Sequence, residues 1–107
     1  MLLVTTETVA GHRVAETLGL TRGNVIRAKH VGNDIVAGFR NFVGGEMNEY
    51  TKLMAEAREQ AKDRMVAHAE AMGANAIVGV RFTTSTVTAG AAEILAFGTA
   101  VRIEAEG

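Results

Sequence analysis

The sequence predicts an α+β fold in which strands come first, then helices, then a long hairpin with an apolar face for the longer helix. Three observations support this. Short strand-like segments divided by glycines fill the first 30 residues, a helical period begins near residue 34, and the last third alternates as a long hairpin. The chain has 107 residues, 48% of them hydrophobic, which is enough for one core and predicts a single domain over 1–107.

Three short strands are expected before residue 30, over 2–5, 13–18 and 24–29. The expected breaks fall at glycines, which are common in turns: Gly11, Gly19 and Gly23. Charged residues alternate with apolar ones in the second and third segments. These strands are therefore expected to be partly solvated or to lie near an edge of the sheet.

Two helices are expected next. Apolar residues after Asp34 fall at i, i+1, i+4, i+7 and i+8, which predicts a short helix that ends at Gly44-Gly45. A longer helix is expected from about Asn48 to Met72, roughly 38 Å at 1.5 Å per residue, with its charged residues in solvent. Its apolar stripe is Tyr50, Leu53, Met54, Ala57, Ala61, Met65, Ala69 and Met72.

The last third predicts a long β-hairpin, with arms over 74–82 and 92–103 and a turn at 88–90. One face is expected to cover the long helix: Ala76, Val78, Val80, Phe82, Leu95, Phe97, Val101 and Ile103. The opposite face carries small or apolar residues: Ile77, Gly79, Ile94, Ala96, Gly98 and Ala100. Such a face suits close packing against another subunit or a ligand, so an oligomer is expected, and Gly98→Val is expected to weaken assembly or folding.

Composition excludes several classes of function. The net charge of −1 provides no positive field, so neither nucleic acid nor an anionic membrane is an expected partner. The absence of cysteine excludes disulfides and thiolate metal sites. The first residues lack the basic start of a signal peptide, and no apolar run reaches the roughly 18 residues of a membrane span. A soluble cytoplasmic protein is expected.

The order and spacing of several short motifs resemble the YbjQ family over nearly the whole chain. These motifs are DIVAGFRNFVGG at 34–45, Tyr50 before a charged Ala-rich helix, GANAIVGV at 73–80 and GTAV at 98–101. The resemblance implies a fold like the dodecin subunit, a two-layer arrangement in which one antiparallel sheet packs on helices. It further implies a ring-shaped homopentamer joined by extra short strands. It also implies an ill-defined function described as heavy-metal binding.

The chain departs from the family pattern after Gly44-Gly45, where Glu46-Met47 replaces the expected Arg-Ser. Glycines that lead into a helix N-terminus present free N–H groups and the positive end of the helix dipole, which favour an anion. An arginine would strengthen that preference. Glu46 weakens it.

Without cysteine, the candidate metal ligands are His30, His12 and His68, and the expected cofactor class is a divalent transition metal of unknown identity. No two of these histidines have a spacing that prearranges a site. His68 borders the apolar stripe, and His30 lies four residues before Asp34, which could orient its ring or cap the helix. A ring would bring several copies of one histidine together. The methionines are expected to pack in the core.

No catalytic residues are predicted. Ser85 lacks the Gly-x-Ser-x-Gly context of an activated nucleophile, and Gly44-Gly45 alone does not make a phosphate loop. The carboxylate pairs Glu56/Glu59 and Glu104/Glu106 are expected in solvent. The sequence thus favours a non-enzymatic, oligomeric metal-ion binding protein. The alternative is an assembly or interaction module that binds an organic ligand or a protein segment between subunits.

Overall fold

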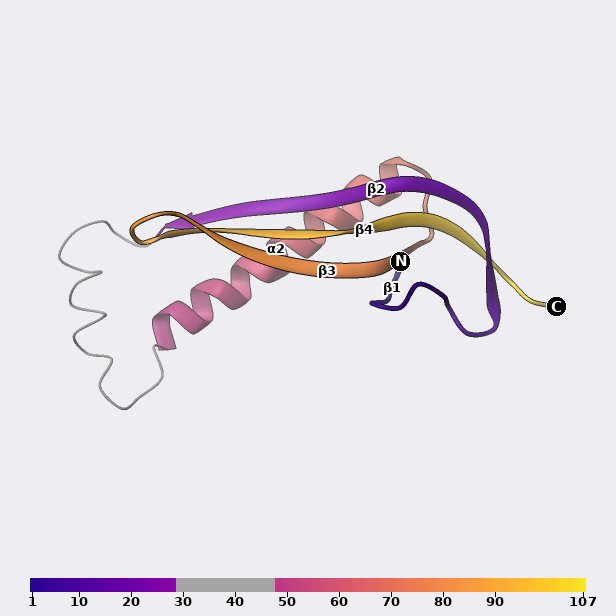
Figure 1. Cartoon of the computed structure of the whole chain (residues 1–107), viewed down its shortest axis with the longest axis horizontal. Coiled ribbons are helices and arrows are strands. Elements are labelled where there is room, and N and C mark those ends of the chain that lie inside the picture. The colour runs from indigo at the N-terminus through magenta and orange to yellow at the C-terminus, as the bar shows by residue number, and fades with distance from the viewer. Residues whose placement is uncertain (29–47) are drawn as a thin grey trace.

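The computed structural model describes residues 1–28 and 48–107, and there it consists of one helix packed on a four-stranded mixed sheet (Figure 1). The elements are β1 (Leu2–Leu3), β2 (His12–Ala28), α2 (Asn48–Ala71), β3 (Ala76–Thr88) and β4 (Ala91–Ala105). The order across the sheet is β1-β3-β4-β2. The α+β class and the long hairpin of β3 and β4 are confirmed.

An antiparallel sheet was expected, but the sheet is mixed. β1 pairs with β3 in parallel, with Leu2 opposite Ala76, whereas β4 pairs antiparallel with both β2 and β3. The alternation of apolar residues is the same for either strand direction, so it could not reveal this parallel pair.

The predicted strands at 13–18 and 24–29 are one continuous strand, β2, which runs through Gly19 and Gly23 without a turn. The register against β4 shifts at two places, between Val14 and Glu16 and between Thr17 and Gly19. Such bulges bend a strand without ending it. The predicted breaks at Gly19 and Gly23 are therefore wrong.

The long helix is confirmed almost to the residue, because α2 spans Asn48–Ala71 against a predicted end at Met72. Figure 1 shows α2 running obliquely along one face of the sheet, and its contacts are mainly with β2 and β4. The short helix predicted after Asp34, and Gly44-Gly45 that would end it, lie outside the described residues.

Relative to the prediction, the two faces of the hairpin are exchanged along β4 and at 76–78 of β3. Beyond the register shift between Val78 and Arg81, Val80 packs in the helix cluster as predicted. The face that α2 covers carries the small or apolar residues, and one core cluster joins Ala57, Ala61, Met65 and Ala69 of the helix to Ile77, Ile94, Ala96 and Ala100. The physical reason lies in the helix, whose stripe is rich in alanine and brings the backbones close together. A face of small residues was needed inside the subunit, so it is not evidence of an outside partner.

Gly23 of β2 lies directly against the backbone of α2. A Cβ atom at this position would lie 2.3 Å from both the Ala61 carbonyl oxygen and the Met65 backbone nitrogen. Only glycine fits between the two backbones. Gly23 therefore fixes how deeply the helix sits on the strand.

Gly98 is also required inside the subunit. It pairs with Thr21 and lies beside the register shift in β3 between Val78 and Arg81. A Cβ atom there would lie 2.7 Å from Cγ2 of Ile77 and 3.0 Å from the Val78 carbonyl oxygen. The expectation that Gly98 packs against another subunit is thus replaced by a contact within the sheet.

Part of the other face of the sheet is covered by the N-terminal segment. Val4 and Val9 pack with Ala76, Val78 and Val101 in a second core cluster. The segment is held by backbone hydrogen bonds from the Val4 N–H to the Ile77 carbonyl at 3.0 Å and from the Gly79 N–H to the Thr6 carbonyl at 2.8 Å. Within the described ranges, no helix has an apolar stretch long enough to cross a membrane.

Candidate functional site

Two of the three predicted metal ligands fall in described parts of the chain. His12 is the first residue of β2, and His68 lies in the last turn of α2. His30 lies outside the described residues. Both described side chains are exposed, so the hydrogen bonds of each ring decide what its other nitrogen can do.

The His12 ring has the hydrogen-bonding pattern of a metal ligand. Its Nδ1 lies 2.9 Å from the Ala10 carbonyl oxygen. Because a carbonyl oxygen only accepts, Nδ1 must carry the proton and donate it. In the neutral ring the proton-free nitrogen is then Nε2. Metal-bound histidines commonly donate their other N–H to a backbone carbonyl in this way, which fixes the tautomer and the ring orientation.

The His68 ring has the opposite pattern. The Arg22 backbone N–H donates to Nδ1 at 3.3 Å, so Nδ1 is the acceptor and the proton of the neutral ring is on Nε2. Thr21 Oγ1 lies 3.4 Å from the same nitrogen, but its proton is directed to the Met65 carbonyl at 2.8 Å. His68 therefore joins α2 to β2, and a metal at Nε2 would have to displace its proton.

The fold does not gather His12 and His68 into one site. His68 contacts β2 at Thr21 and Arg22, whereas His12 lies at the start of that strand, opposite Ala105 of β4. Over residues 1–28 and 48–107, no three His, Cys, Asp or Glu side chains gather closely enough to hold a metal ion. The described residues of one subunit thus do not supply a complete metal site.

The methionines of the long helix pack in the core, as predicted. Met65 is fully buried, and Met54 and Met72 pack against the same cluster. Their thioethers fill gaps in an alanine-rich core. Met1 is exposed, and Met47 lies outside the described residues.

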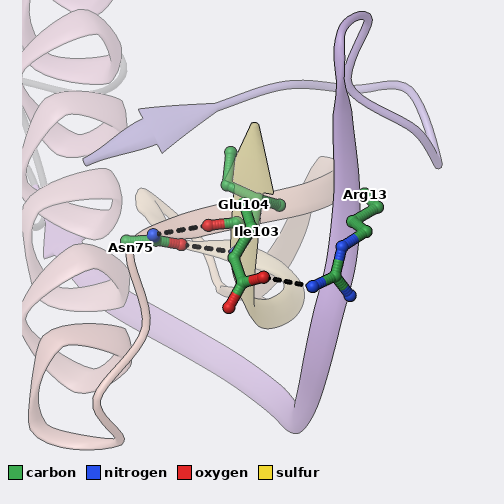
Figure 2. Close-up of polar contacts among 4 residues, drawn as sticks. All are labelled: Arg13, Asn75, Ile103 and Glu104. Atoms are coloured by element: carbon green, nitrogen blue, oxygen red, sulfur yellow. Dashed lines mark hydrogen bonds and ion pairs between the residues drawn. The ribbon is translucent and has the colours of Figure 1, made fainter. Parts of the chain in front are cut away.

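The carboxylates that were considered for acid–base chemistry are exposed. Glu104 forms an ion pair with Arg13 across β2 and β4 (Figure 2), and Glu59 accepts a bond from Lys62 Nζ at 2.7 Å. The hydrogen bond to Glu59 and the attraction of its charge raise the pKa of Lys62 above its ordinary value. Ser85 is exposed on β3. These contacts are those of a solvated surface.

Near the end of α2, Asn75 makes a pair of hydrogen bonds that the sequence did not indicate. Asn75 Nδ2 donates to the Ile103 carbonyl at 3.0 Å, and its Oδ1 accepts from the Ile103 N–H at 2.8 Å, as Figure 2 shows. The side chain thus pairs with β4 as another strand residue would. Arg102 adds a bond from Nη1 to the Gly73 carbonyl at 2.7 Å. Together they fix the connection between α2 and β3.

Two residues close to the histidines were also missed. Thr21 is fully buried, and the Ala10 carbonyl orients His12. Thr21 fell in a predicted break between strands, where no burial was expected. The position of Ala10 offers no signal, because its contribution comes from the backbone.

Comparison with known proteins gives a consistent result over the whole chain. A family model named YbjQ, described as "Putative heavy-metal-binding", matches residues 1–104. A UPF0145 protein of Methanosarcina acetivorans is 59% identical over 103 residues, which is 96% of this chain and 97% of that protein. A UPF0145 protein of Dehalococcoides mccartyi is 56% identical over 104 residues, 97% of this chain and the whole of that protein.

One solved structure shares the fold. It is a crystal structure of a protein with unknown function from Pediococcus pentosaceus, described as a member of the DUF74 family, and it is 18% identical with a TM-score of 0.64. The match covers 97% of this chain and 98% of that one. The family description speaks of metal binding and of no reaction. From the full-length match and these close relatives, the chain belongs to the YbjQ family, whose members carry the name UPF0145.

Proposed function

We propose that this chain is a non-enzymatic, cytoplasmic homo-oligomer, with five subunits expected, that binds a divalent transition metal through ligands from more than one subunit. The observation that carries the metal proposal is the His12 ring, whose Nδ1–H donates to the Ala10 carbonyl and leaves Nε2 free in solvent. The description of the family as heavy-metal-binding supports the same proposal.

A site between subunits follows from the ligand count. One exposed imidazole holds a metal weakly, and the described part of one subunit offers no group of three ligands. Rotational symmetry repeats each ligand, so a single His12 per subunit supplies several imidazoles wherever the copies meet. His30 is a second proposed ligand, and His68 is a third that would first have to release the proton on Nε2.

The ligand set also limits the class of metal. Without cysteine, the chain offers imidazole nitrogen and carboxylate oxygen, which suit zinc, nickel, cobalt and copper in the divalent state. Thiophilic ions that need thiolate ligands are disfavoured. Zinc and nickel are therefore the first metals to test.

The test is equilibrium dialysis of the untagged protein against zinc and nickel, with the His12→Ala, His30→Ala and His68→Ala variants in parallel. We expect stoichiometric metal on the wild type, and loss of most of it from His12→Ala at an unchanged oligomeric state. His68→Ala is expected to lose less metal than His12→Ala, because the His68 ring would first have to release its Nε2 proton before it could bind. A wild type that binds no metal, or a His12→Ala variant that binds as much as the wild type, would contradict the proposal.

The second candidate function is an interaction module that takes an organic ligand or a protein segment between subunits. The exposed apolar side chains of Leu20 and Ile26 on β2 favour it. The two functions are distinguished by what purifies with the protein. A bound chromophore or polypeptide on a metal-free oligomer supports the interaction module, and metal-dependent thermal stabilisation supports the metal proposal.

A further inference from the structure

His12 is the last residue of a four-residue turn, over 9–12, whose backbone conformation is closely specified. The His12 N–H donates to the Val9 carbonyl at 3.1 Å, which closes the turn. Gly11, the third residue, has a φ of 72°, whereas no non-glycine residue of the described ranges has a positive φ. A positive φ at the third residue alone is the feature of a type II β-turn, because a type I′ turn needs a positive φ at the second residue as well. The turn is therefore of type II.

The space around Gly11 does not require a glycine. A Cβ atom at this position would meet nothing within 4 Å, in contrast to Gly23 and Gly98. The requirement comes from the backbone alone, because residues that carry a side chain rarely adopt a positive φ. A side chain at position 11 therefore changes which turn is preferred and adds no collision.

The positive φ of Gly11 determines which way the Ala10 carbonyl points. Turns of types I and II differ in ψ of the second residue and in φ of the third by about 150–170° each, so the peptide group between them is reversed. In the type II turn of this chain the Ala10 carbonyl oxygen lies 2.9 Å from His12 Nδ1. A type I turn would direct this oxygen to the other side. Gly11 thus controls a hydrogen bond that it does not itself form.

The turn is held at both of its ends. Val9 packs against the second core cluster, and the Glu106 N–H donates to the Gly11 carbonyl at 2.9 Å. The carbonyls of Val9, Ala10 and Gly11 each accept a hydrogen bond, two from backbone N–H groups and one from the His12 ring. The ring therefore bonds to an acceptor whose position is already fixed by the core and by the C-terminal end of the chain.

A fixed acceptor decides which nitrogen of the ring is open to a metal ion. A neutral imidazole carries its proton on one nitrogen and a lone pair on the other, and the hydrogen bond of one nitrogen sets the role of the other. The Ala10 carbonyl selects the form with the proton on Nδ1, which leaves the lone pair on Nε2. A metal at Nε2 would in turn make the Nδ1–H a charge-assisted donor to the same carbonyl. Metal binding and the type II turn thus stabilise each other.

We infer that the turn over 9–12 presets the His12 ring for metal binding, and that Gly11 is a positioning residue of this site. The inference rests on the proposed function and adds the backbone element that orients the ligand. Each subunit carries its own turn beside its own His12, so the effect does not depend on how subunits are arranged. Loss of such an outer partner commonly lowers metal affinity by about 10–100-fold.

The test compares the wild type with Gly11→Val and Gly11→Asn in two measurements. Long-range nitrogen–proton NMR of the His12 ring reports its tautomer in the metal-free protein at about pH 8, where an ordinary imidazole is neutral. Calorimetric titration with zinc reports affinity. We expect Gly11→Val to lose the preference for a proton on Nδ1 and to bind zinc about 10–100-fold more weakly. Gly11→Asn should retain both properties, because asparagine adopts a positive φ readily.

Gly73→Val is the matched control. Gly73 also has a positive φ, of 88°, and a Cβ atom there would also meet nothing within 4 Å. It follows α2 and takes no part in the hydrogen bonds of the turn or of His12. This variant should lose stability in urea unfolding but keep the wild-type tautomer and zinc affinity. If Gly73→Val weakens zinc binding as much as Gly11→Val, general destabilisation explains the loss and the inference is wrong.

The outcomes separate this inference from the proposed function. A wild type that binds no zinc overturns both. A wild type that binds zinc no more tightly than Gly11→Val, or whose metal-free His12 ring carries its proton on Nε2, overturns the role of the turn alone. If Gly11→Val does not fold, Gly11→Ala replaces it, since alanine also disfavours a positive φ. Weaker zinc binding by that folded variant supports the inference, and unchanged affinity overturns it.

Discussion

Gly23 lies so close to Met65 that a Cβ atom on the strand residue would be 2.3 Å from the backbone nitrogen of the helix residue. This contact sets the distance between the two layers of the fold. At this point the backbones of the two layers meet, and alanine side chains of α2 fill the remaining space between helix and sheet. The stability of the subunit therefore depends on small side chains at a few positions.

Gly23→Ala should destabilise the fold strongly, because one added methyl group would force α2 away from β2. Overpacking of this kind usually costs about 1–3 kcal/mol, and a clash with backbone on both sides should reach at least about 3 kcal/mol. Urea unfolding at fixed subunit concentration measures the change. Gly107→Ala is the matched control, because a Cβ atom there meets nothing within 4 Å. A Gly23→Ala variant as stable as this control would contradict the packing described.

Gly98→Val should also destabilise the subunit, and the cause should be internal. The branched side chain would collide with Ile77 and the Val78 carbonyl in the same sheet. We expect a loss of at least about 3 kcal/mol, with a smaller loss for Gly98→Ala. Unfolding followed across a range of subunit concentrations separates the two causes. If the loss vanishes at high concentration, assembly and not internal packing explains it.

Thr21→Val tests the buried hydroxyl group under the helix. The substitution keeps the shape of the side chain but removes the bond from Oγ1 to the Met65 carbonyl. The expected loss is about 1 kcal/mol, because the buried bond disappears with little change in packing. Thr83→Val on the exposed part of β3 serves as the control and should change stability by less than about 0.5 kcal/mol. Equal effects at the two positions would show that the Thr21 bond adds nothing.

Asn75→Ala should be more damaging than loss of the ion pair drawn beside it in Figure 2. Asn75 makes two bonds to the backbone of Ile103, so its loss is expected to cost about 1–3 kcal/mol. Arg13→Gln breaks the exposed pair with Glu104 and should cost no more than about 1 kcal/mol. Thermal unfolding of both variants compares them. The reverse order would show that the Asn75 contacts are unimportant.

The ion pair between Lys62 and Glu59 predicts a small alkaline effect. Since Glu59 raises the pKa of Lys62 above its ordinary 10.5, the stabilisation is present below that value and is lost as pH rises through the folded pKa. Glu59→Gln should return the Lys62 pKa towards 10.5. An NMR titration of the Lys62 side chain measures this, and an unchanged pKa in the variant would exclude Glu59 as the cause.

The elements with strong periodicity were predictable from the sequence. The stripe that includes Ala57, Ala61 and Met65 indicated α2, and Gly90 marked the turn between β3 and β4. Which face of the hairpin meets the helix was not predictable, because both faces are apolar and the choice depends on how closely two backbones can approach. Gly23 was interpreted as a turn residue. It must be glycine because of the Ala61 carbonyl of the helix, which is distant in the sequence and so gave no local signal.

The candidate site was less predictable than the fold. The sequence indicated His12 and His68 only as residue types, and their different hydrogen bonds to Ala10 and Arg22 depend on local backbone geometry and on the packing of α2 against β2. The pairing of Arg22 with Phe97 was also hidden, because the two residues are 75 positions apart in the chain and become neighbours only through the register of β2 and β4.

Native mass spectrometry of the untagged protein after exposure to a mixture of divalent metals tests the central proposal most directly, because it reports subunit count and bound mass together. The account predicts a pentamer that carries a stoichiometric transition metal, and loss of that added mass in the His12→Ala variant. A monomer, or an oligomer whose mass equals that of its polypeptides alone at every metal concentration, would contradict it.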